Sequence, residues 1–141
     1  PSMTPKFIAA IILITGLASC SKKEDHQAAV THTRESLLCL ETWNYDHLTR
    51  VKTLRDKIVD EYDGPAWGRI EFSEGNTVNI LEPGKTTSTL SWRVKADSLF
   101  IGSEGYAILN LSGKRLELER TTRRLTEKGV EVIRTETKMI R

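Results

Sequence analysis

The sequence lacks a strong excess of either charge. Its 141 residues carry 21 basic and 19 acidic side chains, which gives a formal net charge of +2. A nucleic-acid-binding protein needs a dense basic face to displace counterions, so this near balance argues against that class. The chain also lacks a long apolar run: Phe7–Ala18 has no charge, but a membrane span needs roughly twenty such residues. The length fits a single domain.

Catalytic and metal-binding motifs are missing as well. The chain contains no G-x-S-x-G, no H-E-x-x-H and no phosphate-binding glycine loop. Asp46 and His47 are neighbours, and adjacent residues of a strand point to opposite faces, which favours a surface histidine over a catalytic base. His26 and His32 are six residues apart in a polar segment, a poor metal-site spacing. We expect a non-enzymatic protein without metal or cofactor.

The N-terminal segment has the character of a secretory signal. Lys6 supplies a positive charge before the twelve-residue apolar stretch Phe7–Ala18, whose length matches the apolar centre of a signal peptide. Because Pro1 and Ser2 precede Met3, we expect either translation from Met3 or a fragment shortened upstream. Residues 1–19 are therefore predicted to form a signal-peptide helix that lies outside the folded domain.

A cysteine ends this segment. Leu17-Ala18-Ser19-Cys20 resembles the lipobox of bacterial lipoproteins, in which the cysteine becomes the first mature residue and carries a diacylglycerol. The resemblance implies lipidation at Cys20 and a membrane lipid as partner, because several acyl chains make a durable anchor. The alternative is an ordinary cysteine behind a leader. If Cys20 is lipidated, Cys39 is left without an intramolecular disulfide partner, and we interpret it as a small core or strand residue.

Residues 20–36 are predicted to form a flexible tether. After Cys20 they are polar and poor in large apolar groups, so they cannot bury enough surface to offset the entropy cost of ordering. Lys23-Glu24-Asp25 resembles the export signal of surface-displayed lipoproteins of the Bacteroidetes type, although a solvated charge cluster explains it equally well. The expected location is the outer membrane, with surface exposure implied by the export signal.

From Leu37 onward the sequence alternates like a series of strands. Leu90, Trp92 and Val94 alternate with polar residues, and turn residues such as Pro83-Gly84 separate the alternating stretches. The first strand is expected to contain Leu38, Leu40, Trp43 and Tyr45. The other seven are expected at 69–73, 77–81, 86–95, 98–101, 105–111, 114–121 and 130–140. Eight short strands joined by tight turns predict an all-β antiparallel barrel or sandwich over residues 37–141.

One segment departs from this alternation. Thr53 is followed three residues later by Asp56, as in a helix N-terminus, and Val51, Leu54 and Ile58 recur near helical spacing. We therefore predict one short helix over residues 53–61, with a long irregular loop as the alternative.

The strand pattern resembles a known family. Trp43, "RIEFSEGNTV", "LSWRVKADSLFI" and "YAILNLSGKRLELER" look like the lipocalin-like domains of small Bacteroidetes lipoproteins. The resemblance covers residues 37–141 and implies an eight-stranded up-and-down barrel, which we expect to be monomeric. Such a barrel either is filled by side chains or holds one small ligand.

Two function classes follow from these expectations. The first is a barrel that binds a small apolar or amphipathic ligand, and the second is a filled barrel that acts through its surface. Aromatic side chains are the candidate ligand contacts, although in so small a domain they also suit the core. These candidates are Trp67, Tyr62, Trp43, Trp92 and Tyr106.

Basic residues gather late in the chain. They are Arg115, Arg120, Arg123, Arg124 and Lys128. One hypothesis is contact with anionic headgroups or an acidic glycan. The interleaved Glu117, Glu119 and Glu127 offset much of this charge, which favours a solvated hairpin.

Overall fold

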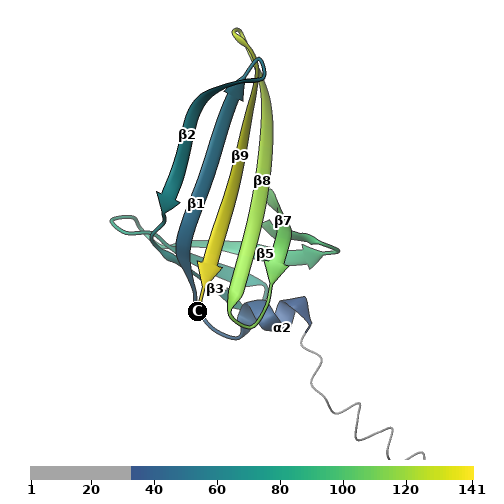
Figure 1. Ribbon diagram of the computed structural model, residues 1–141. Helices are drawn as coiled ribbons and strands as arrows, with labels where there is room; N and C mark the ends of the chain where they lie inside the picture. The colour runs from purple at the N-terminus through teal and green to yellow at the C-terminus, as the bar shows by residue number, and fades with distance from the viewer. Residues whose placement is uncertain (1–32) are drawn as a thin grey trace, which may run out of the picture. The chain divides into compact units, whose positions relative to one another are not determined.

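The computed structural model describes residues 33–141, which contain one helix and nine strands (Figure 1). The predictions for the signal peptide, for Cys20 and for the tether up to residue 32 lie outside these residues. The elements are α2 (Arg34–Cys39), β1 (Trp43–Leu54), β2 (Lys57–Pro65), β3 (Arg69–Ser73), β4 (Thr77–Leu81), β5 (Ser88–Lys95), β6 (Ser98–Ile101), β7 (Glu104–Leu111), β8 (Arg115–Thr126) and β9 (Gly129–Ile140).

Eight of the strands close into an antiparallel barrel. Strands β3 to β9 pair in sequence order, and β1 closes the ring by pairing with β3 at one edge and with β9 at the other. Closure removes the exposed sheet edges that promote aggregation. The predicted all-β, up-and-down, eight-stranded barrel is confirmed, and β2 is an additional ninth strand.

The helix predicted over residues 53–61 is wrong. Strand β1 continues to Leu54, and Arg55 and Asp56 both have positive φ, as a two-residue type I′ turn requires. Strand β2 then returns along β1, from Lys57 opposite Leu54 to Pro65 opposite His47. Pairing of β1 with β9 on its other side fixes the extended backbone, and this long-range pairing overrides the local helical spacing.

The long strands extend beyond the closed barrel. Strands β1, β8 and β9 have 12 residues each, whereas β3 to β7 have between 4 and 8. The pairing of β7 with β8 reaches only to Glu119, and β3 pairs with β1 only at Trp43 and Asn44. Beyond these points the strands form an open sheet with β2 at its edge (Figure 1). We call residues 47–65, 120–126 and 129–135 the projecting sheet.

Helix α2 closes the other end of the barrel. Thr33 caps the helix by accepting a hydrogen bond from the Ser36 amide, and Leu38 is fully buried. The Trp43 indole N–H donates to the Leu38 carbonyl oxygen at 3.0 Å. The placement of Leu38 and Leu40 in the first strand is therefore wrong, because Leu38 is buried from a helix and β1 begins at Trp43. Residues 34–36, at the end of the predicted tether, form the start of this helix.

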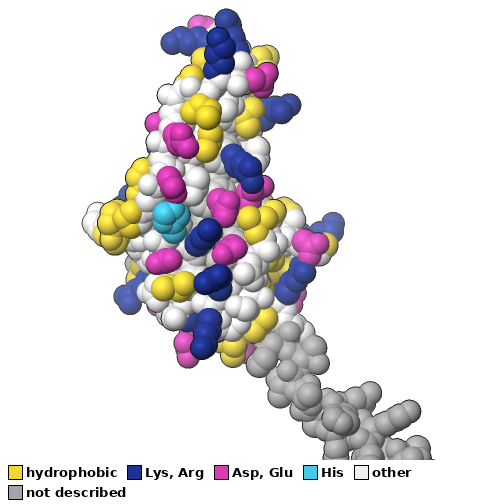
Figure 2. All heavy atoms as spheres, in the orientation of Figure 1, with side chains coloured by type: hydrophobic (Ala, Val, Ile, Leu, Met, Phe, Trp, Pro, Cys, Tyr) yellow, Lys and Arg dark blue, Asp and Glu magenta, His cyan; other side chains and the backbone are white. Residues whose placement is uncertain are grey.

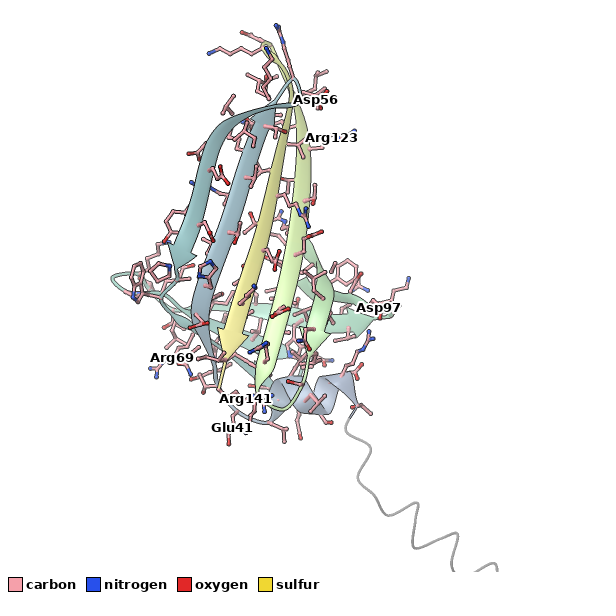
Figure 3. All side chains as sticks on the ribbon, in the orientation of Figure 1. Glu41, Asp56, Arg69, Asp97, Arg123 and Arg141 are labelled. Atoms are coloured by element: carbon pink, nitrogen blue, oxygen red, sulfur yellow. The ribbon has the colours of Figure 1, made fainter. Side chains whose placement is uncertain are left out.

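The hydrophobic core lies between α2 and the barrel wall. Its members are Leu38, Trp43, Ile70, Phe72, Val78, Trp92, Leu99, Ile101, Leu116, Leu118 and Met139. Phe72 and Trp92 make an edge-to-face contact with ring centroids 5.3 Å apart. Charged side chains cover much of the outer face, and Arg141 and Asp56 mark the opposite ends of the long strands (Figures 2 and 3). Within residues 33–141, no helix has the length and apolar character to cross a membrane.

Candidate functional site

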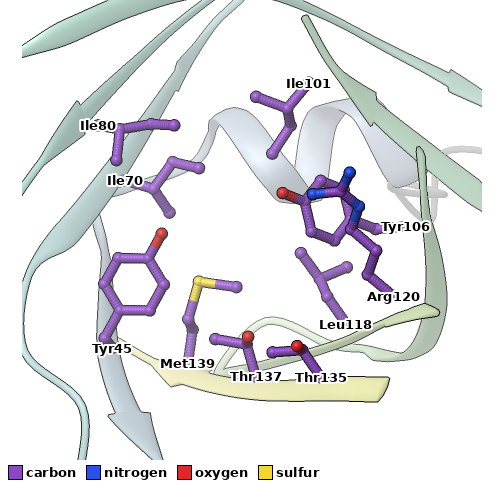
Figure 4. Close-up of a pocket in the computed structure, with 10 residues that line it drawn as sticks. All are labelled: Tyr45, Ile70, Ile80, Ile101, Tyr106, Leu118, Arg120, Thr135, Thr137 and Met139. Carbon is purple, nitrogen blue, oxygen red and sulfur yellow. The ribbon is translucent and has the colours of Figure 1, made fainter. Parts of the chain in front are cut away.

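A cavity of about 180 Å³ lies inside the barrel, above the packed core (Figure 4). Strands from all around the barrel contribute to it. The lining residues are Tyr45, Ile70, Ile80, Ile101, Tyr106, Leu118, Arg120, Thr135, Thr137 and Met139. The barrel of the described residues is thus filled at the α2 end and hollow toward the projecting sheet.

The cavity has an apolar side and a polar side. Its apolar wall is built by side chains that alternate inward along their strands: Ile70, Ile80, Ile101, Leu118 and Met139. The same alternation continues along β8 and β9, where Arg120 pairs with Thr135 and Leu118 pairs with Thr137. Because period-2 alternation keeps residues of one parity on one face, Arg120, Thr135 and Thr137 bring polar atoms into the interior. The site is therefore amphipathic.

Arg120 is held by a small polar network at the rim. Its guanidinium Nη1 lies 2.8 Å from Glu104 Oε2, and its guanidinium carbon is 5.8 Å from the centroid of the Tyr106 ring. The Tyr106 hydroxyl donates to the same Glu104 oxygen at 2.9 Å. Burial, and then the Glu104 carboxylate, raise the pKa of Tyr106 to about 12. The phenol accordingly stays protonated and keeps donating to Glu104 at neutral pH.

Tyr45 faces Tyr106 from the opposite side of the cavity (Figure 4). Burial raises the pKa of Tyr45, with a smaller contribution from Glu82. Gly68 allows the chain to pass behind this ring, because a Cβ there would lie 2.7 Å from the Leu81 carbonyl oxygen and 3.1 Å from the Tyr45 ring. Gly68 also has a φ of 123°, which side chains rarely permit. The Tyr45 wall thus depends on a glycine directly before β3, the strand that pairs with β1.

The five aromatic residues predicted from the sequence do not gather at one place. Tyr106 lines the cavity. Trp43 and Trp92 belong to the core, where the Trp92 indole N–H donates to the Ser73 carbonyl oxygen. Tyr62 lies on β2 and donates to the Pro65 carbonyl oxygen, and Trp67 is 70% exposed. The cavity therefore shares only Tyr106 with that set.

Sequence reasoning missed the polar half of this site. Leu116 and Leu118 are both buried on β8, and the same parity places Arg120 on that inner face. Arg120 was instead grouped with the basic residues of the late hairpin. The period-2 alternation of the strand could have identified Arg120. In a barrel wall this alternation, and not the charge of the side chain, decides which residues face the interior.

Other reactive side chains lie away from the cavity. His47 Nε2 is 2.5 Å from Asp63 Oδ1 on the outer face of the projecting sheet, so its partner is Asp63 and not the adjacent Asp46. Hydrogen bonding to His47 lowers the pKa of Asp63. Cys39 is a free thiol whose pKa is raised by burial and by Glu74 and Glu35. Residues 33–141 contain no group of three or more His, Cys, Asp or Glu side chains placed to hold a metal ion.

The fold and the cavity together define a small closed antiparallel barrel with an amphipathic interior site. Comparison of the chain with protein-family models, with curated proteins and with solved structures gives no match.

Proposed function

We propose that this protein is a lipid-anchored lipoprotein of the outer membrane whose barrel binds a small amphipathic molecule. The observation that carries the proposal is the cavity of about 180 Å³, with aliphatic walls on one side and Arg120, Thr135 and Thr137 on the other. An apolar pocket with a few converging polar groups is the usual form of a small-molecule site.

The cavity volume limits the ligand. A buried apolar cavity of about 150 Å³ holds benzene, whereas sites for drug-sized molecules occupy about 300–1,000 Å³. At about 180 Å³, this cavity suits one ring or a short branched chain with a small polar head. A longer molecule would have to extend out of the barrel along the inner face of the projecting sheet.

The polar side sets the orientation of the ligand. Ile70, Ile80 and Met139 offer contact to an apolar body, and the Thr135 and Thr137 hydroxyls offer hydrogen bonds to a head group. The Arg120 guanidinium can only donate hydrogen bonds, and it already forms an ion pair with Glu104. The arrangement favours a hydroxyl, carbonyl or ether head over a fully ionised acid, which the Glu104 carboxylate would repel.

A direct search for a bound molecule tests the binding function. We expect mass spectrometry of the purified full-length chain to recover one small compound repeatedly above background. Thr137→Phe, which places a ring in the cavity, should abolish the recovery. Thr121→Phe is the matched control, because Thr121 is exposed on the same strand pair. Recovery of nothing from several preparations, or equal recovery from both variants, would refute ligand binding in the cavity.

The anchor has a separate test. The support for it is the sequence Leu17-Ala18-Ser19-Cys20 behind an apolar leader. Cells grown with radioactive palmitate should label the wild-type chain, and Cys20→Ala should remove the label. Protease treatment of intact cells then separates surface display, which Lys23-Glu24-Asp25 favours, from a periplasmic orientation. An unlabelled wild type would end the lipoprotein proposal without affecting the ligand proposal.

A filled barrel that acts through its surface is the second candidate. The observation that favours it is the exposure of Trp67 and of several apolar residues on the projecting sheet. It becomes the better explanation if the cavity yields no compound while Trp67→Ala reduces capture of a protein partner.

A further inference from the structure

The structure brings two turns together at the far end of the projecting sheet. They are the β1–β2 turn at Arg55-Asp56 and the β8–β9 turn at Glu127-Lys128. The Arg55 amide donates to the Val130 carbonyl oxygen at 3.1 Å, and a Cβ at Gly129 would lie 2.8 Å from Arg55 Cγ. The two turns are thus packed into one surface. We call residues 55–59 and 123–130 the hairpin tip.

The hairpin tip concentrates positive charge. It carries five basic and two acidic side chains, a net charge of +3 in a chain whose total is only +2. Arg124 is paired with Glu131. Within residues 33–141, the other four basic residues of the tip form no ion pair: Arg55, Lys57, Arg123 and Lys128. Figure 2 shows Lys and Arg side chains gathered at this end of the molecule.

The same tip exposes apolar side chains. Among residues 33–141, nine large hydrophobic residues are exposed, and four of them lie here: Ile58 (63%), Val59 (52%), Leu125 (81%) and Val130 (41%). Leu125 and Val130 are directly paired across β8 and β9. A shallow groove between the two turns is lined by Leu54, Arg55, Lys57, Val59, Glu127 and Lys128. A solvated hairpin needs no such cluster of aliphatic groups.

We propose that the hairpin tip docks on an anionic lipid bilayer surface. Lysine and arginine are attracted to negatively charged headgroups, and aliphatic side chains between them can enter the boundary between headgroups and acyl chains. An anionic polysaccharide would pair with the basic side chains of the hairpin tip, but it would leave the Leu125 side chain exposed to water. A second copy docked tip to tip would bring two charges of +3 together, which opposes association.

This contact is separate from the lipid anchor and from the cavity. The tip and α2 lie at opposite ends of the described domain (Figure 1). The cavity-lining residues contain no member of the tip. Loss of lipidation or of ligand binding would therefore leave this proposal standing.

Vesicle binding of the full-length chain tests the proposal. Every protein carries Cys20→Ala, so that acylation does not contribute, and the leader is common to all variants. The vesicles contain phosphatidylcholine with or without phosphatidylglycerol. We expect the Cys20→Ala parent to bind vesicles that contain phosphatidylglycerol more tightly than vesicles of phosphatidylcholine alone. Added salt should weaken this preference. Lys57→Gln with Arg123→Gln should reduce binding about fivefold for each residue removed.

Matched variants distinguish the tip from general effects. Lys114→Gln with Arg115→Gln removes the same charge from the β7–β8 turn and the start of β8, and it should leave binding unchanged. Leu125→Ser should weaken binding about tenfold, while Leu109→Ser, at a residue that is 49% exposed on β7, should not. All variants are first compared with the parent by circular dichroism.

Three results would overturn the proposal. One is an equal loss of binding in the tip and β7–β8 variants, which would indicate diffuse charge. The second is tip-dependent binding to a soluble acidic polysaccharide that is unaffected by Leu125→Ser and exceeds vesicle binding. The third is a dimer in solution that Leu125→Ser dissociates, which would assign the tip to a second copy.

Discussion

Arg141 lies over the indole ring of Trp43, with the guanidinium carbon 3.8 Å from the ring centroid. The same guanidinium donates to the Leu37 carbonyl oxygen of α2. Trp43 in turn donates to the Leu38 carbonyl oxygen. Residues from the two ends of the described domain thus hold α2 against the closed end of the barrel.

Arg141→Ala should destabilise this end. A partly desolvated cation–π contact contributes about 1–2 kcal/mol, so the free energy of unfolding should fall by about that amount. Urea denaturation followed by tryptophan fluorescence measures it. Arg69→Ala removes an exposed arginine near the same end and should have little effect. Equal losses in the two variants would mean that the contact with Trp43 contributes nothing.

Ala96→Gly should stabilise the protein. Ala96 has a φ of 52° in the β5–β6 turn, a conformation that costs an alanine about 1 kcal/mol relative to glycine. Gly84→Ala is the reverse experiment, because Gly84 has a φ of 72° and no atom lies within 4 Å of an added Cβ. The two changes should shift the denaturation midpoint in opposite directions. A shift of the same sign in both would contradict the backbone explanation.

The Tyr106 phenol should titrate late. Its pKa is raised from the ordinary 10.0 to about 12, mainly by burial and then by Glu104. A phenol that holds its proton more tightly in the folded state stabilises the fold fully below pH 10, and this contribution is lost as the pH rises toward 12. Glu104→Gln should lower the pKa of Tyr106, as measured by phenolate absorbance. Glu127→Gln, in the distant β8–β9 turn, should leave that titration unaltered.

Protonation of Glu131 should lower the stability of the fold at acid pH. It is only 8% exposed and lies 2.9 Å from both Lys52 Nζ and Arg124 Nη2. The hydrogen bond from Lys52, with the charge of Arg124, lowers the pKa of Glu131 below 4.5. Its contribution is therefore present above pH 4.5 and is lost as the pH falls through the lowered pKa. Glu131→Gln should reduce the Tm at neutral pH, and the difference from wild type should shrink in acid.

Local pattern was enough to predict most of the strands. Residues 98–101 lie between a turn at Ala96-Asp97 and a second turn at Gly102. Their apolar and polar side chains follow a strand pattern, and they form β6 as predicted. The stretch predicted at 77–81 forms β4 in the same way. Alternation and turn residues act over a few neighbours, so they are visible without any knowledge of tertiary contacts.

The projecting sheet shows where local pattern failed. Thr53 and Asp56 have the spacing of a helix N-terminus, yet Leu54 pairs with Lys57 in β2 and with Glu131 in β9. The partner in β9 lies far along the chain, and its pairing energy is absent from any local window. The prediction of Leu38 in a strand failed for the same reason. Leu38 is fully buried beside Trp43, and this contact is not visible in the local pattern.

The sequence by itself determined that most of residues 37–141 form antiparallel strands, because alternation and turn chemistry are local properties. Only the tertiary structure decided which polar residues enter the barrel and which turns meet at its far end. Arg120 joins Tyr45 at the cavity, and Arg55 meets Gly129 at the hairpin tip, since β1 and β9 pair to close the ring. Both sites depend on contacts between residues far apart in the chain.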